Sequence, residues 1–314
     1  MVIRKERTMV KRESKTPGGS YLLRKNTGVS DYVFSAFVFA ALALVAIIVA
    51  YPLYFVLIAS ISDPQDVAMG RTLLVPVGFY LDGYKEIFQY QKIWTAYGNT
   101  IYYTAAGTAL HLILTIPVAY VLSRKGLLLN KFFSGYLLVT MFFSGGTIPL
   151  YMTLRSYGLL NTRAVLIVSG CISVYNIIIA RTFFVTSVPS ELIEAAQIDG
   201  ATELQCFLRI VLPISMTIVA VISLYSAVSY WNAYKPGLMY IRDQSLVPLQ
   251  VVLRELLMVN NEIVTTDANM EELLRRQEQI RYGIIVVSTL PIMLLYPCLQ
   301  RFFSKGVMIG AIKG

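Results

Sequence analysis

Charged residues are spaced so unevenly in this chain that they leave six long segments without Asp, Glu, Lys or Arg. A helix needs about 17–25 residues to cross the roughly 30 Å apolar core of a bilayer. Each segment supplies that length, the fourth by extending past Arg181 to Phe184, and none shows the alternation typical of strands. The charge pattern therefore predicts an all-α membrane protein with six transmembrane helices. The segments lie between Asp31 and Asp63, Lys92 and Arg124, Lys131 and Arg155, Arg163 and Arg181, Arg209 and Lys235, and Arg281 and Arg301.

Lysine and arginine predict the orientation of these helices. Hydrophobic residues make up 56% of the 314 residues, and the basic ones gather before the first span, after the second and at the C-terminus. Because basic residues concentrate on the cytoplasmic side of a membrane, we expect both termini in the cytoplasm. The net charge of +9 reflects this bias and does not indicate nucleic-acid binding. The predicted organisation is a disordered basic tail (residues 1–30), a transmembrane domain (31–304) with a cytoplasmic loop (187–213) and a large outer loop (235–281), and a cytoplasmic C-terminal tail (305–314).

Two features inside this frame leave alternatives open. The outer loop contains two amphipathic pieces, Val251 to Leu257 and Met270 to Ile280, which are expected to form surface helices. They serve either as a solvated cap or as a docking surface for an external partner. The second is His111, an ionisable residue at membrane depth and therefore a candidate for function. Because the spans offer it no acidic partner, we expect a neutral, hydrogen-bonded side chain.

The predicted cytoplasmic loop interrupts the positive bias with four acidic residues. Its pattern predicts a helix, a turn at Gly200 and a second helix. Ser190 is expected to cap the first helix, and Pro213 to stop the second. Ala195 and Ala196 keep the first helix slim, so it could enter a groove on another protein, although an ordinary surface helix would fit as well. The second helix is expected to carry its apolar residues on one face, namely Leu204, Phe207, Leu208 and Val211.

The same loop carries a family resemblance. The run Glu194-Ala195-Ala196 followed by Asp199-Gly200-Ala201, with Ile210-x-Leu212-Pro213 after it, resembles the EAA loop of permease subunits of binding-protein-dependent ABC importers. One departure is that Ile214, Ser215 and Met216 follow where relatives often carry another proline. Other segments resemble the carbohydrate-uptake branch, and within it the second permease of oligosaccharide or polysaccharide-fragment systems: Gly145 to Pro149, Gly158 to Asn161, Trp231-Asn232, Val247 to Gln250 and Lys305 to Gly314.

The resemblance implies a type I ABC importer permease in a bacterial cell membrane. Such a subunit pairs with a homologous permease, docks on two cytoplasmic ATPases that bind ATP and Mg, and receives a sugar from an extracellular or lipid-anchored binding protein. The chain itself is expected to be non-catalytic and to hold no cofactor or metal, since it lacks the Gly-x-x-x-x-Gly-Lys-Ser/Thr phosphate loop. The resemblance assigns ATPase coupling to Glu191, Glu194, Ala195, Ala196, Asp199, Gly200, Ala201 and Pro213.

Sugar recognition requires aromatic faces and groups that bond to hydroxyls. Side chains of these types could line the pathway, although aromatic residues are equally normal in interfacial belts, and in some importers only the partner permease binds sugar. The alternative function is a secondary transporter or channel driven by an ion gradient, which needs intramembrane charges that the six segments lack. A membrane enzyme would need a catalytic constellation. The pathway candidates are Tyr151, Tyr175, Asn176, Tyr225, Tyr230, Trp231 and Asn232.

Overall fold

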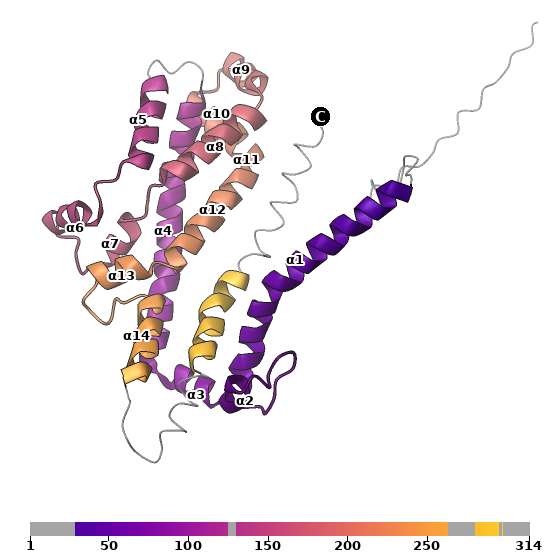
Figure 1. Cartoon of the computed structure of the whole chain (residues 1–314). Coiled ribbons are helices and arrows are strands. Elements are labelled where there is room, and N and C mark those ends of the chain that lie inside the picture. The colour runs from indigo at the N-terminus through magenta and orange to yellow at the C-terminus, as the bar shows by residue number, and fades with distance from the viewer. Residues whose placement is uncertain (1–28, 125–129, 263–279, 295–296, 298–314) are drawn as a thin grey trace, which may run out of the picture. The chain divides into compact units, whose positions relative to one another are not determined.

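The computed structural model describes residues 29–124, 130–262, 280–294 and 297 (Figure 1). The regular structure of these residues is helical, apart from one isolated bridge between Ser62 and Phe79. The predicted terminal tails, apart from residues 29–30, and the predicted helix Met270 to Ile280, apart from Ile280, fall outside the described residues. The chain divides into two units, residues 1–54 and 55–314.

The first unit consists of most of helix α1 (Val29–Ile61). The segment Asp31–Ile61 is long and apolar enough to cross a membrane, as predicted for the first span. Nearly every side chain from residue 31 to residue 54 is exposed, among them the large apolar residues Phe34, Phe39 and Ile47. An apolar surface of this size on one helix requires lipid or other helices to cover it.

Helix α4 is the centre of the second unit (Figure 1). It runs unbroken over 33 residues and is the second helix that could cross a membrane alone. Small and polar side chains on it, such as Ala96, Gly107 and Ala119, are buried, which allows neighbouring helices to approach closely. The helices that pack on it include α3 (Asp82–Gln89), α5 (Asn130–Phe142), α7 (Arg163–Val168), α8 (Val174–Ser187), α12 (Met216–Trp231) and α14 (Leu249–Glu262), with α4 itself spanning Gln91–Ser123.

Two predicted spans are bent rather than straight. The third divides into α5 and α6 (Thr147–Ser156), whose axes differ by 110°. Gly146 lies at this break with φ of +86°, a conformation that glycine adopts without strain. The fifth bends by 79° at Ser215, between residues 203–214 and α12. With each bent pair taken as one span, the described residues contain up to four candidate spans, and the apolar helices α8 and Ile280–Leu294 are shorter. The six-span count stays a prediction.

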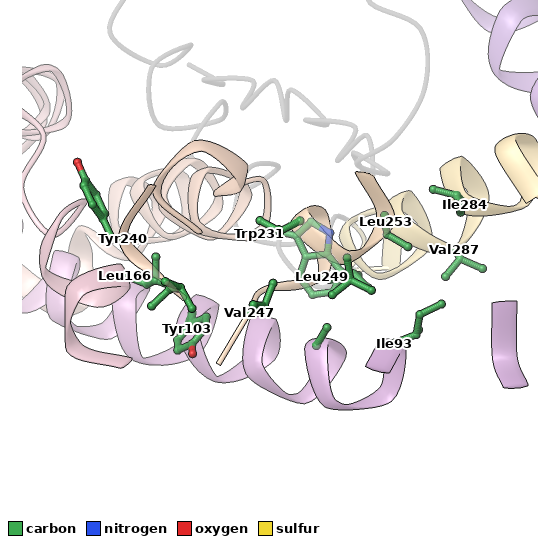
Figure 2. Close-up of a cluster of buried hydrophobic side chains, with 14 of the residues drawn as sticks. Ile93, Tyr103, Leu166, Trp231, Tyr240, Val247, Leu249, Leu253, Ile284 and Val287 are labelled. Carbon is green, nitrogen blue, oxygen red and sulfur yellow. The ribbon is translucent and has the colours of Figure 1, made fainter. Parts of the chain in front are cut away.

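The predicted outer loop is packed into the core of the unit rather than capping it. Helix α13 (Tyr234–Tyr240) and α14 belong to this loop, and Val251, Val252 and Leu253 are all buried. The expected helix at Val251 to Leu257 forms, but its first three residues are buried rather than on the surface. These side chains join a cluster with residues of α4, α7 and α12 (Figure 2).

Polar groups of α4 hold the backbone that leads into α14. Thr100 Oγ1 accepts a hydrogen bond from the Leu249 amide at 2.8 Å, Asn99 donates to the Ser245 and Val247 carbonyls, and Tyr103 donates to Leu246. A buried loop needs such partners for its backbone. Nearby, two hydrogen bonds from Ser245 hold the pKa of Asp243 below its ordinary value.

Candidate functional site

The predicted cytoplasmic loop folds as a helix closed by glycine. Helix α9 (Ser190–Ile198) ends where Gly200 takes a φ of +85°. The Gly200 amide donates to the Gln197 carbonyl and the Ala201 amide donates to the Ala196 carbonyl, at 3.0 and 2.9 Å. This pair of bonds is the Schellman motif, in which glycine tolerates the left-handed residue. The predicted turn at Gly200 is confirmed.

The start of α9 differs from the prediction. Ser190 is the first helical residue, Pro189 precedes it in an extended conformation, and no side-chain bond caps the helix. The predicted Ser190 cap is wrong because proline fixes its own φ and is favourable immediately before or within a first turn.

The second part of the loop starts with a capping box and continues as a wider, π-helical turn. The side chains and backbone of Thr202 and Gln205 bond reciprocally at the start of α10 (Glu203–Cys206). A π-helical turn, Phe207–Val211, leads to α11 (Leu212–Ile214), which ends just after Pro213.

The buried face of this second part differs from the predicted one. Cys206, Phe207 and Val211 are buried, whereas Leu204 and Leu208 are exposed. The predicted apolar face is therefore confirmed for Phe207 and Val211 and wrong for Leu204 and Leu208.

Helix α9 is anchored by one apolar residue and presents the rest of its surface outward. Ile193 is 3% exposed and packs in a cluster with residues of α4, α8 and the second part of the loop. Ile198, by contrast, is 86% exposed. The predicted coupling residues lie together on this loop: Glu191, Glu194, Ala195, Asp199, Gly200 and Pro213 are exposed, and Ala196 and Ala201 are half-buried.

A cavity of about 630 Å³ lies between α4, the residues before α8, α8 itself and α12. It brings together four of the predicted pathway residues. Tyr175 and Tyr225 are about half exposed, which leaves their ring faces accessible. The lining contains no Asp, Glu, Lys or Arg. It consists of His111, Gly170, Ser173, Tyr175, Asn176, Leu224, Tyr225, Ser226, Val228, Ser229, Tyr230 and Ile292.

No protein-family model matches the sequence. A polygalacturonan/rhamnogalacturonan transport system permease protein of Bacillus subtilis is 36% identical over 287 residues, which cover 91% of this chain and 100% of that protein. This chain belongs to the family of ABC importer permeases. A melibiose/raffinose/stachyose import permease protein of the same organism is 28% identical over 267 residues, 84% of this chain and 91% of that protein.

A solved structure agrees with the sequence comparison. It is the crystal structure of a bacterial ABC transporter involved in the import of the acidic polysaccharide alginate. One of its chains is 30% identical to this permease and superposes with a TM-score of 0.77, over 89% of this chain and 99% of that chain. The predicted all-α fold of an ABC importer permease is therefore confirmed.

His111 fixes the orientation of Asn176 in the cavity of the permease. Its Nδ1 lies 3.0 Å from the Cys171 carbonyl oxygen, which can only accept, so Nδ1 carries the proton. Nε2 is then an acceptor for the side-chain amide of Asn176 at 3.0 Å, and Thr115 lies at 3.3 Å. This arrangement agrees with the hydrogen-bonded histidine expected from the sequence. The amide oxygen of Asn176 is left facing away from the ring.

The remaining pathway candidates lie outside the cavity lining. Trp231 is 4% exposed, and its indole N–H donates to the Ser288 carbonyl at 2.9 Å within the core cluster (Figure 2). Tyr151 is half-buried beside Tyr240, with ring centroids 6.2 Å apart, and Asn232 is exposed at the end of α12. The packing of Trp231 accounts for its burial without a sugar contact.

Sequence reasoning missed several residues of the permease that the fold brings to these sites. Ser226 is buried in the cavity lining, and its hydroxyl has no hydrogen-bond partner among the described residues. Glu203 bonds to both the loop and α4, although only its charge was visible in the sequence. No local signal in the sequence indicated either residue, because both contacts depend on the tertiary structure. Among the described residues, no group of three or more His, Cys, Asp or Glu could hold a metal ion.

Proposed function

We propose that this permease forms half of the translocation pathway of an ATP-driven importer for oligosaccharides or polysaccharide fragments. The observation that carries the proposal is the 36% identity over the whole length of a polygalacturonan/rhamnogalacturonan permease. We place the chain in a bacterial plasma membrane with six spans and both termini in the cytoplasm. The exposed apolar surface of α1 and the basic tail before it support this topology.

The proposed partners are a homologous permease, two cytoplasmic ATPases and an extracellular or lipid-anchored solute-binding protein. ATP and Mg bind to the ATPases, so this chain is a non-catalytic subunit without a cofactor. Helix α9 is the proposed coupling helix. It combines exposed carboxylates at Glu191 and Glu194 with exposed apolar side chains at Leu192 and Ile198, a surface suited to a groove with basic and apolar walls.

The cavity is the proposed contact with the sugar. Tyr175 and Tyr225 supply ring faces for stacking, and Asn176 in the same lining carries an amide that can bond to a hydroxyl. The cavity gives no support to the alternative of an ion-driven secondary transporter. Its described lining carries no charge, and both nitrogens of His111 are already hydrogen-bonded.

Reconstitution into proteoliposomes tests the function. Wild-type permease would be combined with its partner permease, the ATPases and the binding protein, and uptake of labelled oligogalacturonides and raffinose would be measured. We expect uptake to require internal ATP. Glu194→Ala and Gly200→Pro should lower uptake by about tenfold or more, within the usual range of coupling energies, because they alter the docking helix.

The matched control is Glu255→Ala, which removes a carboxylate from α14 in the outer loop. This variant should insert and transport as the wild type does. Uptake that continues without any ATPase, or that follows an imposed ion gradient, would contradict the proposal.

A further inference from the structure

Glu203 connects the coupling loop to α4 through both of its carboxylate oxygens. Oε1 accepts a hydrogen bond from the side-chain amide of Gln197 at 2.7 Å, and Oε2 accepts one from the Tyr120 hydroxyl at 3.2 Å. Nη2 of Arg124 lies 3.6 Å from Oε1. Gln197 belongs to α9 and Tyr120 to the last turn of α4. One carboxylate therefore bridges the proposed coupling helix and the central helix.

The two ends of this bridge differ in how firmly they are held. The Tyr120 ring is 6% exposed and packs between the rings of Phe184 and Phe207, with centroids 6.0 and 4.9 Å away. Gln197 is exposed on α9. Beside the bridge, Tyr120 and Glu194 line a cavity of about 380 Å³, so the space between α9 and the core is not filled by side chains. The Tyr120 end is held in the core, whereas the Gln197 end lies on an exposed face of α9.

The bridge contributes little to stability, and this makes it testable. The side chain of Glu203 is 60% exposed and that of Arg124 is 28% exposed. An ion pair this accessible to solvent contributes little to the stability of the fold. A hydrogen bond, however, is lost beyond about 3.5 Å, so a displacement of α9 by about 1 Å would break or strain the contact. Coupling requires a contact of this kind, which differs between two states.

We infer that Glu203 is a positioning residue that transmits the movement of the coupling helix to α4. The inference rests on the proposed function. The polypeptide links α9 directly to α8 and α10, whereas the carboxylate adds a connection to α4, the helix that carries His111 in the lining of the sugar cavity. Sugar release and nucleotide state are then coupled through a helix that is distant from α9 in the sequence.

The test is the number of sugar molecules imported per ATP hydrolysed in the reconstituted complex. Glu203→Ala and Tyr120→Phe should each lower this ratio by about fivefold, the lower end of typical coupling effects, while ATP hydrolysis continues. Because both variants remove the same link, the double variant should be no worse than Glu203→Ala alone. Glu203→Gln keeps one oxygen acceptor and should give an intermediate ratio.

Tyr136→Phe is the matched control, since it makes the same chemical change on α5, and no hydrogen bond of the Tyr136 hydroxyl is present among the described residues. It should leave the ratio unchanged.

A merely structural role for Glu203 would reduce the amount of assembled complex without changing sugar per ATP. Unchanged ratios in Glu203→Ala and Tyr120→Phe, or additive losses, would overturn the inference. If Glu203→Ala fails to assemble, Tyr120→Phe decides. A wild-type complex that imports no sugar would instead refute the proposed function.

Discussion

Replacing Ile193 with aspartate is expected to detach α9 from the transmembrane domain and abolish ATP-driven uptake. Ile193 is 3% exposed and is the one buried residue of α9. It lies in a cluster that includes Ile116 of α4, Phe184 of α8 and Phe207 of the second part of the loop. An unpaired carboxylate in such a cluster costs several kcal/mol, more than a helix of nine residues can offset by other contacts. The helix would lose its anchor, and with it the fixed position that docking requires.

Ile198→Asp is the matched control, with the same change five residues later on the same helix. Ile198 is 86% exposed, so the substitution should leave the melting temperature of the purified permease unchanged. Ile193→Asp should lower the melting temperature and make residues 188–202 susceptible to limited proteolysis. Equal melting temperatures for the two variants would contradict the anchoring role. Weaker ATPase binding by Ile198→Asp, with its fold intact, would in addition support docking through the exposed face.

The features that the sequence predicted well are those set by local chemistry. Gly200 ends a helix because a left-handed residue is needed there, and the acidic, alanine-containing helix before it forms where expected. The apolar segments emerge as helices because hydropathy and length are properties of a single segment.

The features that the sequence did not predict depend on partners distant along the chain. Residues Val251 to Leu253 are buried because Thr100, 149 residues before Leu249, bonds to the backbone that leads into α14. A hydropathy profile also carries no information on the directions of helix axes, so it could not show that the chain bends by 110° near Gly146. Trp231 looked suitable for a sugar and was found in the core, because its chemistry is equally suited to packing.

The contacts of Glu203 show the same limit within the proposed coupling loop. Its two bonding partners come from α9 and from α4, and the second lies 83 residues away. A pattern of charges could mark this loop as acidic, but it could not distinguish the carboxylate that points to the core from those that face outward. Each residue of the bridge is of a type that is common on surfaces or in helices, so only the tertiary structure reveals the bridge.

Gly107→Ala should destabilise the permease strongly, because the closest helix contact in the cavity wall has no room for a methyl group. A Cβ at Gly107 would lie 2.5 to 2.7 Å from three ring carbons of Tyr230. The ring has little freedom to retreat. Its hydroxyl donates to the Ile167 carbonyl at 2.7 Å, and Gly170 also lies against it, at 3.4 Å from an added Cβ. Overpacking of this kind typically costs about 1–3 kcal/mol.

The chain supplies a control for this prediction on the same helix. Gly98 of α4 is exposed, and a Cβ there would meet nothing within 4 Å. Gly98→Ala should keep or raise the melting temperature, since alanine favours a helix over glycine by about 1 kcal/mol. Thermal unfolding of both variants in detergent measures the difference, and the double variant Gly107→Ala/Tyr230→Leu should recover part of the loss. If Gly107→Ala and Gly98→Ala have the same melting temperature, α4 and α12 do not pack through Gly107. If Gly107→Ala melts lower and the double variant recovers, a contact between the Tyr230 ring and the backbone of α4 sets this part of the cavity wall. Widening that contact should then alter sugar uptake before it alters assembly.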